Sequence, residues 1–252
     1  MENLINFFKS LSFSLGRLFH SFLSLIYKEN CVVCGAPCAF ENRPAIGSKG
    51  VQNLCKKCLK DVEILSGFPH TKFDGVEIYS ACFYKGVIRD LIHKLKFNHK
   101  KDAARVLAVF LYEFYEKIEV YKKECGTSLP PVQSLILVPV PTNKNNIGKR
   151  GYNNVFEIVK EFSALSNIPF SKNLLLKVKN TKPQYNLGPK QRKNNVSGCF
   201  KINLEDYEKH RGKTFLIIDD IFTTGATLNE IIKTFHKNGI ENIFCITLSK
   251  AV

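Results

Sequence analysis

The chain has 252 residues, of which 44% are hydrophobic, so it can bury a substantial core in one large domain or two smaller ones. This composition excludes general disorder, and nine cysteines in a chain of this length exclude a disulfide-stapled miniprotein. The formal net charge of +15 favours polyanionic partners such as pyrophosphate, nucleotides or nucleic acid, although a lysine-rich genome would produce a similar basic surface.

Residues 1–30 carry an apolar stripe. Leucine and phenylalanine recur at alternating spacings of four and three from Leu4 to Leu25, which predicts an amphipathic helix of about six turns. Charged residues and serines interrupt the other faces, so the stretch fails as a membrane span or a signal peptide. We expect the stripe to pack on the protein or on a partner. The alternative is that residues 3–26 contact a membrane surface. The expected location is cytoplasmic, with peripheral membrane attachment in that alternative.

Two Cys-x₂-Cys pairs follow this stripe. The first, Cys31 and Cys34, is followed after 20 residues by the second, Cys55 and Cys58, a spacing typical of four-cysteine zinc sites. Each pair can turn two thiolates toward one Zn²⁺, and four protein ligands leave no open position, so the predicted role is structural. Cys38 is a nearby fifth thiol that could substitute for one of the four.

The region from residue 60 to residue 131 predicts one strand and two helices. Val76–Phe83 is rich in β-branched and aromatic residues, a helical pattern follows Gly86, and Asp102 opens a second helix. Three lysines here could reach an anionic ligand but more commonly form a solvated face: Lys94, Lys96 and Lys100. Three cysteines in apolar runs are expected to be small core residues: Cys82, Cys199 and Cys245.

The strongest pattern occupies residues 214–228. The apolar run of residues 215–218 predicts a buried parallel strand, and Asp219 and Asp220 follow at its carboxyl end, where open α/β sheets place their ligands. A turn of small and hydroxyl residues then opens a helix, and it consists of Thr223, Thr224, Gly225, Ala226 and Thr227. Helix N–H groups with these hydroxyls predict a phosphate site, and adjacent carboxylates suit ribose hydroxyls or a bridging Mg²⁺. An ordinary strand, turn and helix is the alternative.

Two further strands are predicted beside this one. Residues 135–140 form an apolar run ended by prolines, and Lys149 and Arg150 follow it before a helix, which is a plausible anion site. Residues 243–248 form another apolar strand, after a helix that Gly239 is expected to end. Strand, helix and strand in this order form a βαβ unit and favour a parallel sheet.

The run TFLIIDDIFTTGATL at residues 214–228 resembles the fingerprint of the type I phosphoribosyltransferases, which bind phosphoribosyl pyrophosphate (PRPP). The resemblance implies that Asp219 and Asp220 are the catalytic acids and hold the ribose hydroxyls of PRPP. It also implies that the turn of residues 223–227 holds the 5′-phosphate, and that Mg²⁺ accompanies PRPP.

Further motifs resemble those of the ComF/GntX family of phosphoribosyltransferase-like proteins. That family combines a four-cysteine module, a VPVP strand with an RGFNQ-type loop, a segment with Gln, Leu, Arg and Asn, and the PRPP fingerprint. This chain has all four in that order, with LVPVP at residues 137–141 and RGYN at residues 150–153. Asn154 stands where the family usually has Gln, a change that keeps the amide.

The resemblance implies an α/β fold with a type I phosphoribosyltransferase-like parallel sheet flanked by helices, and a small N-terminal zinc-ribbon-like module. The expected parts are an amphipathic helix over residues 1–30, a zinc module over residues 31–60 and a phosphoribosyltransferase-like domain over residues 61–252. Lys149 and Arg150 would face the pyrophosphate of PRPP. Residues 182–195 would form a mobile flap over the site, with Lys182, Gln184 and Arg192 as its ligand-facing residues; a basic surface hairpin is the alternative.

Three functions follow from this reading. The preferred one is a ComF-type protein that binds PRPP with Mg²⁺, assists DNA uptake in natural competence and meets single-stranded DNA or DNA-handling proteins. The second is an active phosphoribosyltransferase, a pentosyl-transferring glycosyltransferase, in nucleobase salvage. The third is a non-catalytic PRPP sensor or scaffold. No pattern in the sequence predicts a pocket for an acceptor base.

Overall fold

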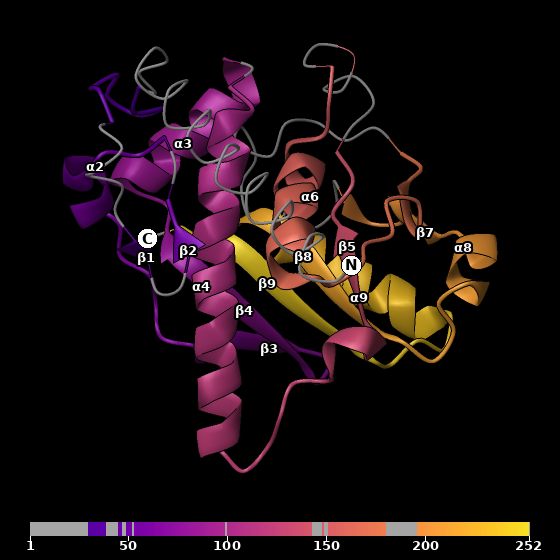
Figure 1. Cartoon of the computed structure of the whole chain (residues 1–252). Coiled ribbons are helices and arrows are strands. Elements are labelled where there is room, and N and C mark those ends of the chain that lie inside the picture. The colour runs from indigo at the N-terminus through magenta and orange to yellow at the C-terminus, as the bar shows by residue number, and fades with distance from the viewer. Residues whose placement is uncertain are drawn as a thin grey trace, which may run out of the picture.

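A computed structural model describes residues 30–38, 45–46, 49–51, 53–98, 100–142, 148, 151–179 and 196–251 (Figure 1). Several predictions concern residues outside these ranges. They are the helix predicted over residues 1–30, of which only Asn30 is described, with its membrane-surface alternative, the basic pair Lys149 and Arg150, and the flap residues Lys182, Gln184 and Arg192.

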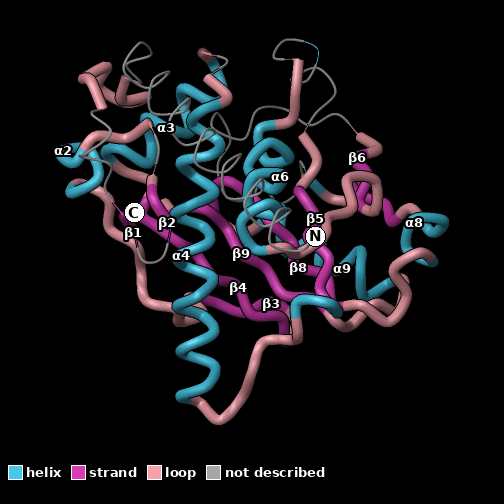
Figure 2. Tube along the Cα trace, in the orientation of Figure 1, coloured by secondary structure: helices cyan, strands magenta, loops and turns pink. Residues whose placement is uncertain are grey.

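The centre of the molecule is a five-stranded sheet in the order β3-β4-β9-β8-β5 (Figure 2). The strands are β3 (Thr71–Phe73), β4 (Val76–Phe83), β9 (Ile243–Lys250), β8 (Thr214–Phe222) and β5 (Leu135–Pro139). Strand β3 is antiparallel to β4, and the other three pairings are parallel. The predicted parallel sheet is therefore confirmed, with an antiparallel strand at one edge.

Helices and a short β-pair cover the two faces of this sheet. One face packs against α3 (Gly86–Phe97), α4 (Asp102–Glu124) and α6 (Asn154–Ser166), and Figure 1 shows α4 and α6 lying across it. The other face packs against α9 (Ala226–Lys237) and the antiparallel pair of β6 (Leu175–Lys177) and β7 (Phe200–Ile202). Two further short helices are η2 (Val132–Ser134) and α8 (Leu204–Glu208).

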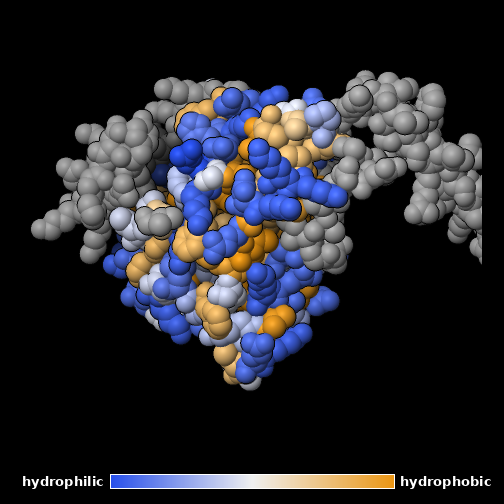
Figure 3. Space-filling view, turned by 90° about the vertical axis from the view of Figure 1, so that its left-hand side faces the viewer, coloured by the Kyte–Doolittle hydropathy of each residue, from blue (hydrophilic) through white to orange (hydrophobic). Residues whose placement is uncertain are grey.

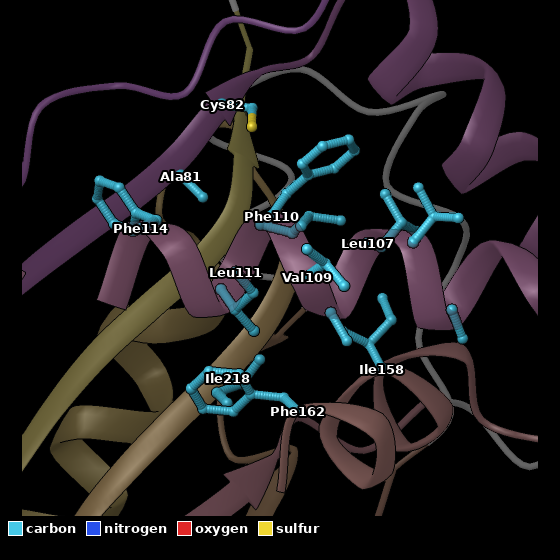
Figure 4. Close-up of a cluster of buried hydrophobic side chains, with 14 of the residues drawn as sticks. Ala81, Cys82, Leu107, Val109, Phe110, Leu111, Phe114, Ile158, Phe162 and Ile218 are labelled. Carbon is cyan, nitrogen blue, oxygen red and sulfur yellow. The ribbon is translucent and has the colours of Figure 1, made fainter. Parts of the chain in front are cut away.

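The apolar stripe of α4 anchors the first of these faces. Figure 4 shows Leu111 of α4 directed toward Ile218 of β8 and Phe162 of α6, while Phe110 and Phe114 lie on the side of α4 that carries the β4 residues Ala81 and Cys82. All of these side chains are fully buried. The three core cysteines predicted from the sequence, Cys82, Cys199 and Cys245, are also buried, which confirms that prediction.

The four-cysteine segment packs on the same core as these helices. It contains β1 (Ala45–Ile46), β2 (Lys49–Gly50) and α2 (Lys56–Lys60). Val51, Leu54, Cys31 and Cys58 are buried in one continuous hydrophobic cluster with residues of α3 and α4. The segment therefore shares apolar surface with the helices that cover the central sheet.

Strand β8 is longer than the sequence predicted. The apolar run ends at Ile218, but pairing with β9 continues through Ile221↔Ser249 and Phe222↔Lys250. Backbone hydrogen bonding to a neighbouring strand does not require an apolar side chain, so the strand continues past the end of the apolar pattern. As a result, Asp219 and Asp220 lie inside the carboxyl-terminal half of β8 instead of following it.

Candidate functional site

The candidate site lies where β5 and β8 approach their carboxyl ends and α9 begins. The Val140 N–H donates to the Ile218 carbonyl at 2.9 Å, so the end of β5 is held directly beside the two acids of β8. Because successive strand residues point to opposite faces, Asp219 shares a face with Ile217 and Asp220 shares the other face with Ile218. The structure thus brings the two predicted strands and both predicted acids together at one edge of the sheet.

Asp220 forms an ion pair with a residue that the sequence did not assign to the site. The Nζ atom of Lys96, in the last turn of α3, lies 2.5 Å from Oδ2 of Asp220, and the two side chains are only 21% and 15% exposed. The solvated face preferred for this lysine from the sequence is therefore wrong. Only the packing of α3 on the sheet could reveal the pair, because Lys96 and Asp220 lie far apart in the chain.

Asp219 occupies a different electrostatic environment. Burial, reinforced by the neighbouring charge of Asp220, raises the pKa of Asp219 to about 7. The opposing influences are a hydrogen bond from the Asp220 N–H to Oδ1 of Asp219, at 2.9 Å, and the charges of Lys96 and Lys177. The two carboxylates therefore place unfavourable negative charge at the sheet edge, which a bound cation or hydroxyl donors would stabilise.

The turn between β8 and α9 has the geometry of an anion site. Gly225 is the N-cap of α9, with φ of +72°, and it supplies no side chain to the first turn of the helix. A Cβ atom at this position would lie 2.5 Å from the Phe73 ring and 2.8 Å from the Phe222 ring, so only glycine fits. Thr223 and Thr224 are exposed, and Ala226 and Thr227 begin the helix. The N-terminus of α9 is thus open to a phosphate group.

The loop after β5 is tied both to its strand and to α3. The side chain of Asn153 caps α6 by accepting from the Val155 N–H at 3.0 Å, and it donates to the Val140 carbonyl at 3.2 Å. The hydroxyl of Tyr152 donates to the carbonyl of Leu95 at 2.6 Å, immediately before Lys96. Residues of the RGYN motif therefore connect the end of β5 to the lysine that contacts Asp220.

The β6–β7 pair brackets the segment predicted to be a flap. Lys177 pairs with Phe200 in this antiparallel pair, so the chain leaves and re-enters the β6–β7 pair at neighbouring points. The Gly198 N–H donates to Oε1 of Glu230 at 2.6 Å, which attaches the returning chain to α9. Burial lowers the pKa of Lys177, whose charge in turn acts on Asp219.

A row of polar side chains, buried at Ser80 and Thr247, crosses the sheet from Asp219. Asp219 is in register with Thr247, and Thr247 with Ser80. The hydroxyls of Ser80 and Thr247 lie 2.7 Å apart, and Nδ1 of His70 lies 3.2 Å from Ser80 Oγ. Burial, aided by the charge of Lys250, lowers the pKa of His70 to about 4. Sequence reasoning missed this row because only strand register makes its members neighbours.

The four cysteines form a separate centre. The sulfur atoms of Cys31, Cys34, Cys55 and Cys58 all lie within 4.8 Å of one another, and those of Cys34 and Cys55 are 3.7 Å apart. Tetrahedral zinc with Zn–S bonds of 2.3 Å requires sulfur atoms about 3.8 Å apart. The four thiols thus fit a structural metal ion such as zinc.

Local backbone structure explains how each cysteine pair converges. In the first pair, the Gly35 N–H donates to the Cys31 carbonyl at 2.8 Å, and φ of +76° at Gly35 closes the knuckle. In the second, Cys55 is the N-cap of α2 and its sulfur accepts from the Cys58 N–H at 3.5 Å. Burial and the surrounding thiols raise the pKa of Cys58; for Cys31, backbone hydrogen bonds outweigh burial and lower the pKa to about 6. Four thiolates at this spacing would require a cation.

Comparison with known proteins agrees with this arrangement. Residues 167–251, which include β8, the turn and α9, match the phosphoribosyl transferase domain family. The chain is 32% identical over 161 residues to competence protein F of Haemophilus influenzae, covering 64% of this chain and 67% of that protein. It is 24% identical to DNA utilization protein YhgH of Salmonella typhi over 213 residues, and of Shigella flexneri over 216 residues. These two matches cover 84% and 86% of this chain, and 80% and 82% of the relatives.

The mostly parallel sheet, the two acids and the glycine-containing turn at the carboxyl end of β8, and the domain match together define a phosphoribosyltransferase-like protein. Its similarity to competence protein F, together with the four-cysteine centre, shows that the chain belongs to the ComF/GntX family. Within the part of the chain that the structure describes, every helix is too short or too polar to cross a membrane.

Proposed function

We propose that this protein binds PRPP with Mg²⁺ at the carboxyl edge of β8 and assists DNA uptake in natural competence. The observation that carries the PRPP part is the placement of Asp219 and Asp220 beside the glycine-capped N-terminus of α9. Relatives named for competence and DNA utilization support the DNA part.

In this proposal each element of the site has one task. Asp219 and Asp220 accept hydrogen bonds from the ribose hydroxyls, and the turn of residues 223–227 binds the 5′-phosphate through N–H groups and threonine hydroxyls. Lys149 and Arg150 face the pyrophosphate, and Lys182, Gln184 and Arg192 belong to the flap that closes over it. Asp219 and Asp220 would hold Mg²⁺, which would supply positive charge to offset that of the pyrophosphate.

If the protein is an enzyme, the reaction is displacement at the anomeric carbon of the ribose. A nucleophile forms the new bond there as the bond to pyrophosphate breaks, and positive charge develops on the sugar. The carboxylates stabilise that charge, while basic side chains stabilise the departing pyrophosphate. Nucleobase salvage predicts pyrophosphate release that depends on an added base, whereas a sensor or scaffold predicts PRPP binding without turnover.

The proposed parts of the chain are those expected from the sequence, namely residues 1–30, 31–60 and 61–252. Zinc is the proposed occupant of the four-cysteine centre, where it would fix the fold of the second part against α3 and α4. We further propose a cytoplasmic location. In the alternative with peripheral membrane attachment, residues 3–26 make the contact with the membrane surface.

Calorimetric titration of Mg-PRPP into the wild type and an Asp219→Asn, Asp220→Asn variant tests the PRPP proposal. We expect the wild type to bind and the variant to lose binding by at least about a hundredfold, because each lost charge-assisted hydrogen bond costs about 1.5–3 kcal/mol. Ribose hydroxyls need acceptors, so equal affinity in both proteins would refute the assigned site. Absence of wild-type binding would refute PRPP binding altogether.

A hollow on the outer side of α3 favours a direct DNA contact. It has a volume of about 460 Å³ and is lined by Tyr84, Arg89, Asp90, His93, Lys94 and Asn98. The side of the molecule that carries α2 and α3 is largely hydrophilic over its described part, with a hydrophobic band through the middle (Figure 3). An aromatic ring beside Arg89 and Lys94 suits single-stranded DNA, whose bases stack while cations bind its phosphates.

Fluorescence anisotropy with a labelled oligonucleotide tests the DNA contact at several salt concentrations. An Arg89→Glu, Lys94→Glu variant should bind at least tenfold more weakly and show a shallower salt dependence, because two phosphate contacts are replaced by repulsion. The matched variant replaces two other exposed lysines, Lys123→Glu on α4 and Lys233→Glu on α9, changes the net charge by the same amount and should bind like the wild type. Equal weakening by both variants would indicate general charge attraction and not a site.

A further inference from the structure

Lys96 stands out among the cations of the described residues because it is held against a candidate ligand-binding acid. The exposed pairs, such as Lys85 with Glu63 at 3.4 Å, have side chains about 60% exposed and contribute little. The pair of Lys96 and Asp220 is closer and largely shielded from water. Replacing either partner by another ion would therefore change the charge balance of the site.

We infer that Lys96 is a ligand-binding residue of the proposed PRPP site: it neutralises Asp220 in the free protein and transfers to the pyrophosphate when Mg-PRPP binds. This inference rests on the proposed function and deepens it. It assigns to α3, a helix outside the residues that match the transferase domain, a part in recognising the diphosphate group.

A second buried lysine pair shows what a purely structural arrangement looks like in this fold. Lys122 lies 2.5 Å from Glu77, but Glu77 also accepts from the Tyr79 hydroxyl and lies 3.3 Å from Lys72. Asp220, by contrast, has Lys96 as its one ion-pair partner among the described residues. The carboxylate of Asp220 is therefore satisfied by a single ammonium group, which a ligand can replace.

The position of Lys96 is fixed at its backbone and adjustable at its ammonium group. Leu91 and Leu95 are buried in the core, and the Leu95 carbonyl accepts from the Tyr152 hydroxyl. The loop that carries Tyr152 also carries the basic residues assigned to the pyrophosphate. A lysine has a flexible four-carbon side chain, so Lys96 can leave Asp220 while α3 stays in place.

Charge explains why the exchange would accompany ligand binding. Asp219 and Asp220 must receive ribose hydroxyls or a hydrated cation, and the ammonium of Lys96 occupies part of that acceptor capacity. Mg-PRPP delivers hydroxyl donors to the carboxylates and phosphate oxygens to the ammonium group at the same time. The ion pair is thus replaced by two favourable contacts, and no buried charge is left without a partner.

Binding measurements with two ligands test the inference. Isothermal titration of Lys96→Met with Mg-PRPP should show affinity at least tenfold below that of the wild type, because a charge-assisted contact to the pyrophosphate is lost. Ribose 5-phosphate with Mg²⁺ lacks the pyrophosphate, so its affinity for Lys96→Met should equal or exceed that for the wild type. Lys100→Met, which removes an exposed lysine four positions later, should bind both ligands normally.

The outcomes separate this inference from the proposed function. If wild-type protein binds PRPP and Lys96→Met binds it equally well, the inference fails and the PRPP site stands. An equal loss for both ligands would mean that Lys96 only supports the structure. If the wild type does not bind PRPP, the proposed function itself fails. Should Lys96→Met not fold, the ¹⁵N signal of the Lys96 side chain in wild-type protein must shift more with PRPP than with ribose 5-phosphate, and equal shifts would overturn the inference.

Discussion

The four-cysteine centre and the sheet-edge site differ in how their residues are brought together. The cysteines come from two short turns, each of which folds its own pair, and only the meeting of the two pairs depends on the rest of the chain. The sheet-edge site draws Lys96 from α3, Asn153 from the start of α6, Lys177 from β6 and both acids from β8. A centre built from local turns serves stability, whereas a site built from several elements can change when one of them moves.

Charge separates the two regions further. Four clustered thiols become favourable together only when a metal cation neutralises them. The two acids of β8 already have lysines near them, so part of their charge is balanced by the chain itself. Loss of metal should therefore damage the cysteine centre much more than the sheet edge.

Replacing Cys55 with Ser should have the largest effect on stability. The variant should lose its bound zinc and melt at least about 5 °C lower, because a structural metal site contributes several kcal/mol to folding. Zinc content by mass spectrometry and a thermal melt measure both consequences. The matched variant Cys125→Ser, at an exposed thiol outside the cluster, should keep its zinc. A full complement of zinc in Cys55→Ser would contradict the assignment of this centre.

Gly225→Ala should lower the free energy of unfolding by about 2–4 kcal/mol, because it places an alanine in the left-handed region and its Cβ clashes with two rings. Gly239→Ala is the control, because its φ is +71° but a Cβ there meets nothing within 4 Å. Denaturant unfolding of both variants separates two contributions to the lost stability. Gly239→Ala measures the cost of a left-handed alanine alone, and the additional loss in Gly225→Ala measures the clash with the rings. Equal destabilisation would show that Phe73 and Phe222 move aside. The cysteine centre should retain its metal in either variant, which sharpens the separation of the two regions.

A smaller effect is expected from pH, through His70. The pKa of His70 is about 4 in the folded protein, against about 6.5 in an unfolded chain. The unfolded state therefore takes up a proton first as pH falls from about 6.5 to about 4. A difference of that size corresponds to about 3 kcal/mol, and solvent screening at the half-buried ring reduces the stability lost over that window to about 1–2 kcal/mol. Melting temperatures at pH 7 and pH 4.5 should differ less for His70→Asn than for the wild type. The same acid sensitivity in both proteins would exclude His70 as a cause.

Patterns within short stretches predicted most of the fold. The continuous apolar runs identified β5, β8 and β9, and the helical spacing after Asp102 identified α4. These predictions succeeded because burial on both faces of a parallel strand, or on one face of a helix, imposes a local order on apolar residues. The end of β8 was less predictable, because backbone pairing with β9 and not side-chain hydrophobicity determines it.

The sequence by itself determined that the chain carries two cysteine pairs, an acid pair and a glycine-containing turn, since each lies within a few consecutive residues. It also determined the family resemblance, which the comparisons confirm. Only the tertiary structure decided that Lys96 meets Asp220, that Ser80, Thr247 and His70 form a polar row, and that the cysteine segment shares the core of α3 and α4. Such contacts join residues remote in the chain, and strand register and helix packing alone determine which of them become neighbours.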